Sequence, residues 1–131
     1  MIDKSDVQKW LNEYGQAWTQ GSPDAVAKLF HDNATYQETP FDEPMQGKQQ
    51  IRAYWQDGAS DAQEAVSFSS EVWSVSDNEA FAGWTASFQR VASGVWVELD
   101  GIFKLRFVKE KADLECLELR EWWHRRENNQ A

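Results

Sequence analysis

The stretch VWVELDGIFKLRFV, residues 95–108, decides the fold because its side chains alternate between two different surfaces. Side chains along a β-strand point in turn to the two faces of a sheet. Every second residue from Val95 to Phe107 is apolar or glycine, whereas the residues between them, from Trp96 to Arg106, form a mixed surface. The stretch is therefore predicted to be a strand whose apolar face is turned toward the helices.

Three other stretches show the same alternation, at residues 65–75, 79–91 and 114–125. The sequences SDN, ASG and KEKAD separate the four stretches and are rich in turn-forming residues. Such short turns join strands that pair antiparallel. The second part of the chain is thus predicted to be an antiparallel sheet.

The first part of the chain has helical spacing instead. Its opening segment is predicted to be an amphipathic helix in which Ser5 and Gln8 form a capping box. The apolar residues that define this helix are Val7, Trp10, Leu11, Tyr14 and Trp18.

Shorter elements are predicted between this helix and the sheet. Ser22 and Pro23 suit the N-cap and first position of a short second helix that also carries Phe30. Residues 35–38 are interpreted as a brief strand, and a third helix is predicted after Gly47.

Helices followed by antiparallel strands are typical of the α+β class, here with three N-terminal helices packed on one face of the sheet. A single domain is predicted over residues 1–126. Residues 127–131 contain nothing apolar to dock and are predicted to form a flexible tail.

Composition narrows the range of partners. The net charge of −9 disfavours binding to nucleic acid or to an anionic membrane surface. The single cysteine, Cys116, cannot form an internal disulfide, and the N-terminus lacks the layout of a signal peptide, so a cytoplasmic protein is expected. The sequence has neither a zinc-type spacing of histidines and cysteines nor a phosphate-binding glycine loop, so no metal and no cofactor are expected.

One acidic residue breaks the apolar face of the last strand. Alternation places Glu121 between Leu119 and Trp123, on the side turned toward the helices. Burial penalises an ionised carboxylate. Two interpretations follow: a structural ion pair with Arg125 or Arg90, or an acid, base or polar anchor inside an apolar pocket.

Three stretches carry a resemblance to a known family: LNEYGQAWTQGSPDAVAKLFHDNATYQETPF (11–41), PMQGKQQIRAYW (44–55) and LDGIFKLRF (99–107). They resemble the nuclear transport factor 2-like superfamily, which includes ketosteroid isomerase and the SnoaL-like polyketide cyclases. The resemblance implies a cone-shaped, cystatin-like fold, in which a strongly curved sheet wraps around the first helix to make a pocket, commonly in a homodimer.

Catalytic roles come from the same resemblance. The oxyanion-hole tyrosine of ketosteroid isomerase falls on Tyr14, and its carboxylate base falls on Glu38. Its second acid falls on Phe103, so that group is absent, whereas Glu121 occupies a pocket-facing position. The hypothesis is that Glu38 is the base, Tyr14 stabilises an oxyanion, and Glu121 is a partner acid or substrate anchor.

Aromatic residues could wall the pocket or simply pack the core. They are Trp18, Trp55, Trp84, Phe103 and Trp123. A pocket of this kind would hold a small hydrophobic ligand.

The leading hypothesis is acid/base chemistry without a cofactor, of the isomerase, cyclase or dehydratase type, on an apolar and possibly cyclic carbonyl compound. The alternative is a non-catalytic ligand-binding or dimerisation domain. In both cases a homodimer is expected through the outer sheet face, where Trp73, Trp96 and Trp122 offer apolar anchors if they lie adjacent.

Overall fold

The computed structural model describes residues 2–110 and 113–128 of the chain. Its helices are α1 (Lys4–Thr19), α2 (Pro23–Ala27) and α3 (Gly47–Trp55), and a π-helical turn, Gln56–Ser60, continues α3. Its strands are β1 (Phe30–Gln37), β2 (Met45–Gln46), β3 (Gln63–Ser76), β4 (Glu79–Arg90), β5 (Trp96–Glu110) and β6 (Asp113–Asn128). None of the described helices is long and apolar enough to cross a lipid bilayer.

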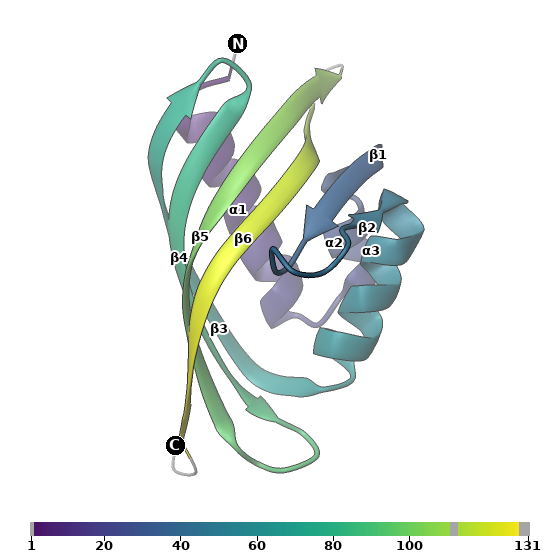
Figure 1. Ribbon diagram of the computed structural model, residues 1–131, viewed down its shortest axis with the longest axis vertical. Coiled ribbons are helices and arrows are strands. Elements are labelled where there is room, and N and C mark those ends of the chain that lie inside the picture. Colours follow the sequence, from purple (N-terminus) through teal and green to yellow (C-terminus); the bar gives the residue numbers. More distant parts are fainter. Residues whose placement is uncertain (1, 111–112, 129–131) are drawn as a thin grey trace.

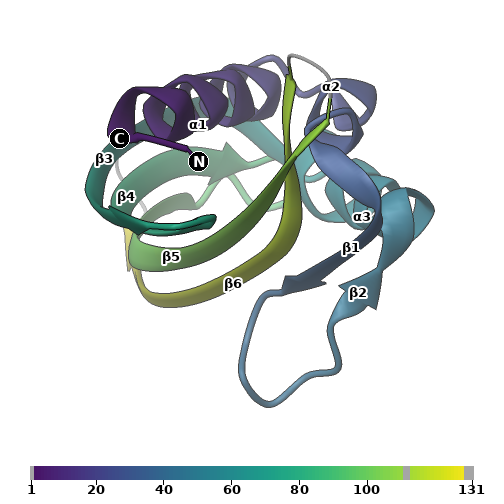
Figure 2. The ribbon, with the colours of Figure 1, turned by 90° about the horizontal axis from the view of Figure 1, so that it is seen from above.

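The strands form a single sheet in the order β2-β1-β6-β5-β4-β3. The four strands β3 to β6 pair antiparallel, as predicted, whereas β1 lies parallel to β6. The sheet is strongly curved, and α1 lies along its concave side (Figures 1 and 2). The predicted α+β cone with its helices on one face of the sheet is therefore confirmed.

The core lies between α1 and the apolar face of β5. Leu105 and Phe107 are buried on that face, as the alternation predicted. The rings of Trp10 and Phe107 meet edge to face with their centroids 5.4 Å apart. Each large aromatic side chain buries about 150–250 Å², so these ring contacts contribute much of the apolar burial that holds α1 to the sheet.

The predicted capping box is wrong. Helix α1 begins one residue before Ser5, and its N-cap is Asp3, whose carboxylate accepts a hydrogen bond from the Asp6 main-chain N–H at 2.9 Å. The Asp6 carboxylate in turn accepts from the Asp3 N–H at 3.1 Å. Ser5 therefore lies inside the first turn, where its hydroxyl donates to Asp3.

Strand β1 is longer than predicted, because Phe30 belongs to it and not to the second helix. Phe30 pairs with Cys116 of β6 and is completely buried. The two-residue strand β2 was not predicted. Both differences come from pairing between distant segments, which the local helical spacing around Phe30 does not register.

The C-terminal boundary also differs from the prediction. Glu127 and Asn128, which were assigned to the flexible tail, are the last residues of β6 and pair with Val97 and Trp96. The rest of the predicted tail, residues 129–131, lies outside the described residues.

A row of apolar side chains crosses the convex face of the sheet. The Trp73 ring lies against Gly83 of β4, Gly83 pairs with Ile102 of β5, and Ile102 pairs with Trp122 of β6. Trp73, Ile102 and Trp122 are 49%, 37% and 41% exposed. Trp96 does not join this row, because it is the first residue of β5 and lies six residues before Ile102. The expectation that Trp73, Trp96 and Trp122 form one cluster is therefore wrong.

Gly101 provides space that Trp84 needs. A β-carbon at Gly101 would lie 2.7 Å from the Trp84 ring and 2.8 Å from the main-chain oxygen of Trp122. We expect Gly101→Ala to lower the free energy of unfolding by about 1–3 kcal/mol through overpacking, measured by urea denaturation followed by far-ultraviolet circular dichroism. Gly58→Ala is the matched control, since its nearest neighbour is 4.0 Å away; equal losses in both variants would contradict the steric explanation.

Candidate functional site

An aromatic cavity of about 220 Å³ lies between the concave face of the sheet and helices α1 and α3. Its rings come from α1, β1, α3, β4 and β6: Tyr14, Trp18, Tyr36, Tyr54, Trp55, Trp84, Phe88 and Trp123. Its charged and amide side chains are Glu38, Gln63, Arg90, Glu121 and Arg125. The three predicted catalytic residues thus line one cavity.

Glu121 is turned into this cavity, as strand alternation predicted. It pairs with Phe103 of β5 and is 7% exposed. Among the described residues, its side chain makes no hydrogen bond and no ion pair. The interpretation as a structural ion pair is therefore wrong, because Arg90 and Arg125 both pair with Glu127.

The surroundings of Glu121 favour its protonated form. Burial raises the pKa of its carboxyl group well above the ordinary value, and the negative charge of Glu38 raises it further. A protonated carboxyl is a hydrogen-bond donor as well as an acceptor. Glu121 can therefore offer a proton to an oxygen atom inside the cavity.

Glu38 reaches the same cavity from the end of β1. It follows Gln37, the last residue of the strand, and is half-buried. The indole N–H of Trp123 donates to the main-chain oxygen of Glu38 at 3.2 Å, which ties this segment to β6. The two carboxyl groups therefore stand in different surroundings, since Glu38 is open to solvent and Glu121 is enclosed.

Two tyrosine hydroxyls meet deep in the cavity wall. Tyr14 on α1 and Tyr36 on β1 are joined by a hydrogen bond of 2.9 Å, in which either oxygen can be the donor. Burial raises the pKa of both hydroxyls, and any ionisation of the neighbouring Glu121 would raise it further. Both tyrosines therefore remain neutral, and the pair has a proton to donate toward the cavity.

Tyr54 of α3 is a third hydroxyl beside the carboxyl groups. Its pKa is raised first by burial and then by the nearby carboxyl groups of Glu121 and Glu38. Tyr54 therefore remains neutral beside the two carboxyl groups.

Four of the five aromatic residues predicted as pocket walls line the cavity: Trp18, Trp55, Trp84 and Trp123. Phe103 does not line it; its ring lies behind that of Trp84, stacked at a centroid distance of 5.0 Å. The indole N–H groups of Trp55 and Trp84 are buried and have no hydrogen-bond partner within the described part of the chain.

Sequence reasoning missed two tyrosines of the site. Tyr36 stands two residues before Glu38, so strand alternation alone would have placed it on the same face. Tyr54 belongs to the third predicted helix, for which no functional role was predicted. Arg90 and Arg125 were considered only as partners of Glu121, although both also line the cavity.

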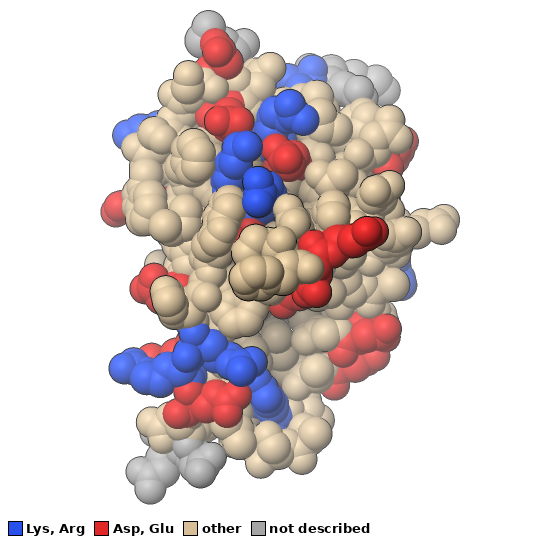
Figure 3. Space-filling model, in the orientation of Figure 1, with Lys and Arg blue, Asp and Glu red and all other residues tan. Residues whose placement is uncertain are grey.

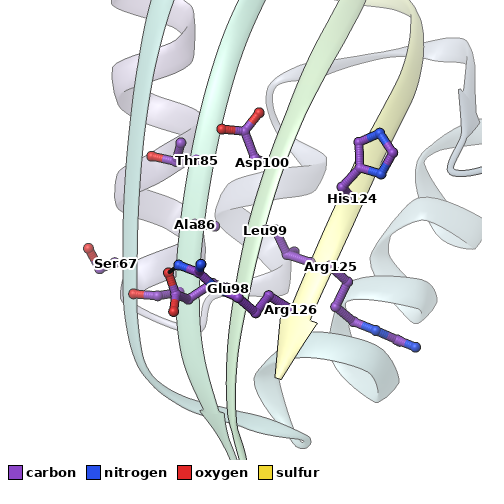
Figure 4. A pocket seen from close by; sticks show the side chains of 10 residues that line it. Ser67, Thr85, Ala86, Glu98, Leu99, Asp100, His124, Arg125 and Arg126 are labelled. Carbon is purple, nitrogen blue, oxygen red and sulfur yellow. Dashed lines mark hydrogen bonds and ion pairs between the residues drawn. The ribbon is translucent and has the colours of Figure 1, made fainter. Parts of the chain in front are cut away.

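A second, larger hollow lies on the convex face of the sheet. It is an open groove of about 500 Å³, where Thr85, Asp100 and His124 stand in register on β4, β5 and β6 (Figure 4). Asp100 thus faces away from the cavity, as the alternation of residues 95–108 predicted, and so does His124. The groove has no aromatic wall except the His124 ring, and no group of its side chains, or of any others in residues 2–110 and 113–128, is arranged to hold a metal ion.

Comparisons with known proteins identify the family. A model of the SnoaL-like domain matches residues 9–113. No curated protein sequence matches the chain. The remaining comparison is with solved structures.

Solved structures with the same fold have diverse activities. A hexachlorocyclohexane dehydrochlorinase (LinA type 2) has a TM-score of 0.79 at 7% identity, covering 95% of this chain and 87% of that chain. SalBIII, an epoxide hydrolase/cyclase-like enzyme with a role in pyran ring formation in the polyether salinomycin, has a TM-score of 0.77 at 16% identity and covers 95% of each chain. A nuclear transport factor 2-like superfamily protein from Salmonella enterica serovar Typhimurium has a TM-score of 0.76 at 14% identity, covering 91% and 89%. The superfamily resemblance is confirmed, and at these identities the likeness concerns the fold alone.

Protonation of Glu121 should make stability depend on pH. Above pH 4.5 the unfolded chain releases this proton while the folded protein keeps it, so stability falls as pH rises toward the raised pKa of the folded state. The slope attributable to this group is at most about 1.4 kcal/mol per pH unit. Glu121→Gln should remove it, as measured by urea denaturation between roughly pH 5 and pH 8.

The exposed Glu71 of β3 provides the matched control, since Glu71→Gln removes the same charge from the surface. A constant difference between the parent and Glu121→Gln across this pH range would contradict the buried, protonated carboxyl.

Proposed function

We propose a function from one premise: the chain belongs to the SnoaL-like domain family, whose model covers residues 9–113. The protein binds a small, apolar, ring-containing carbonyl compound and carries out acid/base chemistry on it without a cofactor. The reaction is of the isomerase, cyclase or dehydratase type. The observation that carries the proposal is that Glu38 and the unpaired Glu121 line the same aromatic cavity.

Glu38 acts as the base in this proposal. Its carboxylate takes a proton from the carbon beside the carbonyl group, and the electron pair of the broken C–H bond moves onto the carbonyl oxygen. Glu38 suits this role because it is half-buried and open to solvent, unlike the enclosed Glu121. Tyr54 lies beside Glu38 on the cavity wall.

Glu121 and Tyr14 act as hydrogen-bond donors to the oxygen on which negative charge develops. Both are held protonated by burial, so they can donate at neutral pH. Donors fixed in advance in a water-poor cavity stabilise such a charge better than mobile water does. The Tyr36 hydroxyl holds that of Tyr14 in place.

The fate of the enolate decides the reaction. A proton returned by Glu38 to another carbon gives isomerisation, loss of a leaving group gives elimination, and attack on a second carbonyl gives ring closure. The names of two enzymes with this fold, a dehydrochlorinase and an epoxide hydrolase/cyclase-like protein, support elimination and ring closure as general reaction types that the fold accommodates.

Exchange of enolisable protons tests this proposal directly. The parent protein should accelerate deuterium uptake from D₂O at the α-carbon of cyclic ketones such as 2-tetralone, followed by proton NMR. Glu38→Gln should reduce this acceleration by roughly 10²- to 10⁴-fold, the usual contribution of a positioned general base. Asp100→Asn, on the convex face, is the control and should leave the rate unchanged.

Equal exchange rates in the parent and Glu38→Gln would remove the catalytic proposal. Ketone binding without any exchange by the parent would favour a non-catalytic ligand-binding domain.

The protein is also proposed to form a homodimer through the apolar row Trp73, Ile102 and Trp122. These side chains lie side by side on three strands and are each more than a third exposed. Arg120 lies over the Trp122 ring, with its guanidinium carbon 4.9 Å from the ring centroid. Aromatic residues and arginine are enriched in protein interfaces.

Ile102→Lys should convert the proposed dimer into a monomer, because it buries a charge at the centre of the row. Light scattering coupled to size-exclusion chromatography measures the mass. Lys104→Ala, two residues along β5 on the same face of the sheet, should remain dimeric. A monomeric parent protein at micromolar concentration would rule out this interface.

A cytoplasmic location is proposed as well. The single cysteine, Cys116, is buried and free. Buried free thiols are typical of proteins from reducing compartments.

A further inference from the structure

Two arginines share one carboxylate at the edge of the aromatic cavity. Arg90 at the end of β4 and Arg125 on β6 both line the cavity. The Arg90 Nη2 lies 3.0 Å and the Arg125 Nε lies 3.7 Å from the same oxygen, Oε1 of Glu127. These three side chains therefore carry a net charge of about +1.

Glu127 is a weak partner for both arginines. All three side chains are partly exposed, at 39% for Arg90, 50% for Arg125 and 43% for Glu127. Partly exposed ion pairs contribute little to stability, so replacing one costs little. Each guanidinium has five N–H donors, and those not used by Glu127 are available to another carboxylate.

The arginines lie at the other end of the cavity from Glu121. Glu121 and Arg125 share the inner face of β6 and are four residues apart, which corresponds to about 13 Å along a strand. In Figure 4 the Arg125 side chain extends toward the helical side of the molecule, away from Thr85 and Asp100. Figure 3 shows basic side chains gathered over this end of the sheet, next to a hollow. The cavity therefore has an acidic end and a basic end, with aromatic rings between them.

We propose that the ligand carries a carboxylate at the end opposite its reacting carbonyl group, and that Arg90 and Arg125 bind this carboxylate. Glu127 holds the two guanidiniums in place in the empty protein and gives them up when the ligand enters. The proposal rests on the proposed function for the position of the carbonyl, but it concerns binding alone. Because the chain has a net charge of −9, a local pair of arginines is required to attract an anion.

A rigid pair of probes tests the charge without changing the shape of the ring system. 6-Acetyl-2-naphthoate carries a ketone and a carboxylate at opposite ends of its rings, and its methyl ester replaces the carboxylate with an uncharged group that is larger by one methyl. Isothermal titration calorimetry should show that the parent binds the acid about tenfold more tightly than the ester, as for a charge-assisted hydrogen bond. This preference should weaken as salt is added.

Variants at the basic end then identify the binding groups. Arg90→Gln and Arg125→Gln should each weaken binding of the acid much more than binding of the ester, and so remove most of the preference for the acid, whereas Glu127→Gln should increase affinity for the acid. The control is Arg126→Gln, because Arg126 carries the same charge on the next residue but pairs with Glu98 on the convex face. Circular dichroism spectra establish that each variant is folded.

Equal affinities of the parent for the acid and the ester would overturn the proposal. Failure of both compounds to bind at millimolar concentration would also overturn it. So would a loss of preference in Arg126→Gln as large as that in Arg90→Gln or Arg125→Gln. The Glu38→Gln variant separates this result from the catalytic proposal. It should slow proton exchange to the extent given above but keep the preference for the acid. If the parent protein catalyses proton exchange but binds the acid no more tightly than the ester, only the proposed carboxylate site is rejected.

Discussion

The burial of the Glu121 carboxyl group in an aromatic cavity, without a counter-ion among the residues that the structure describes, is the constraint on which the interpretation of this structure depends. Moving an ionised carboxylate out of water is costly, and a hydrophobic residue of similar size would remove that cost. In this protein the raised pKa of Glu121 instead keeps its carboxyl group protonated and therefore neutral. Polar groups that reduce stability in this way are typical of functional sites. The register of β5 with β6 fixes this arrangement, because it sets Glu121 opposite Phe103.

Strand alternation was sufficient to predict much of the sheet and the orientation of its most important side chain. A shift of one residue exchanges the two faces of a strand, so a pattern as regular as that of residues 95–108 leaves little freedom. The same rule placed Glu121 inside and Asp100 outside. The positions of Tyr14 and Glu38 could not be derived in this way. They came from a resemblance to a family, and the structure brings both residues to the cavity.

The features that were not predicted depend on contacts between distant parts of the chain. Phe30 has helical spacing with its neighbours, but it gains a fully buried position by pairing in parallel with β6. The hydrogen bond between Tyr14 and Tyr36 joins residues of a helix and a strand that share no local pattern. Likewise, the meeting of Arg90 and Arg125 at Glu127 requires the antiparallel register of three strands. Local propensity carries no information about such partners.

The concentration of indole rings around the cavity gives the protein an optical property of its own. Trp18 lies with its centroid 5.2 Å from that of Trp55 and 6.2 Å from that of Trp84, and all three rings line the cavity. Rings this close couple their electronic transitions, so any guest that separates or reorients them alters the emission and the near-ultraviolet spectrum. The unlabelled protein can therefore serve as a sensor for screening mixtures of metabolites.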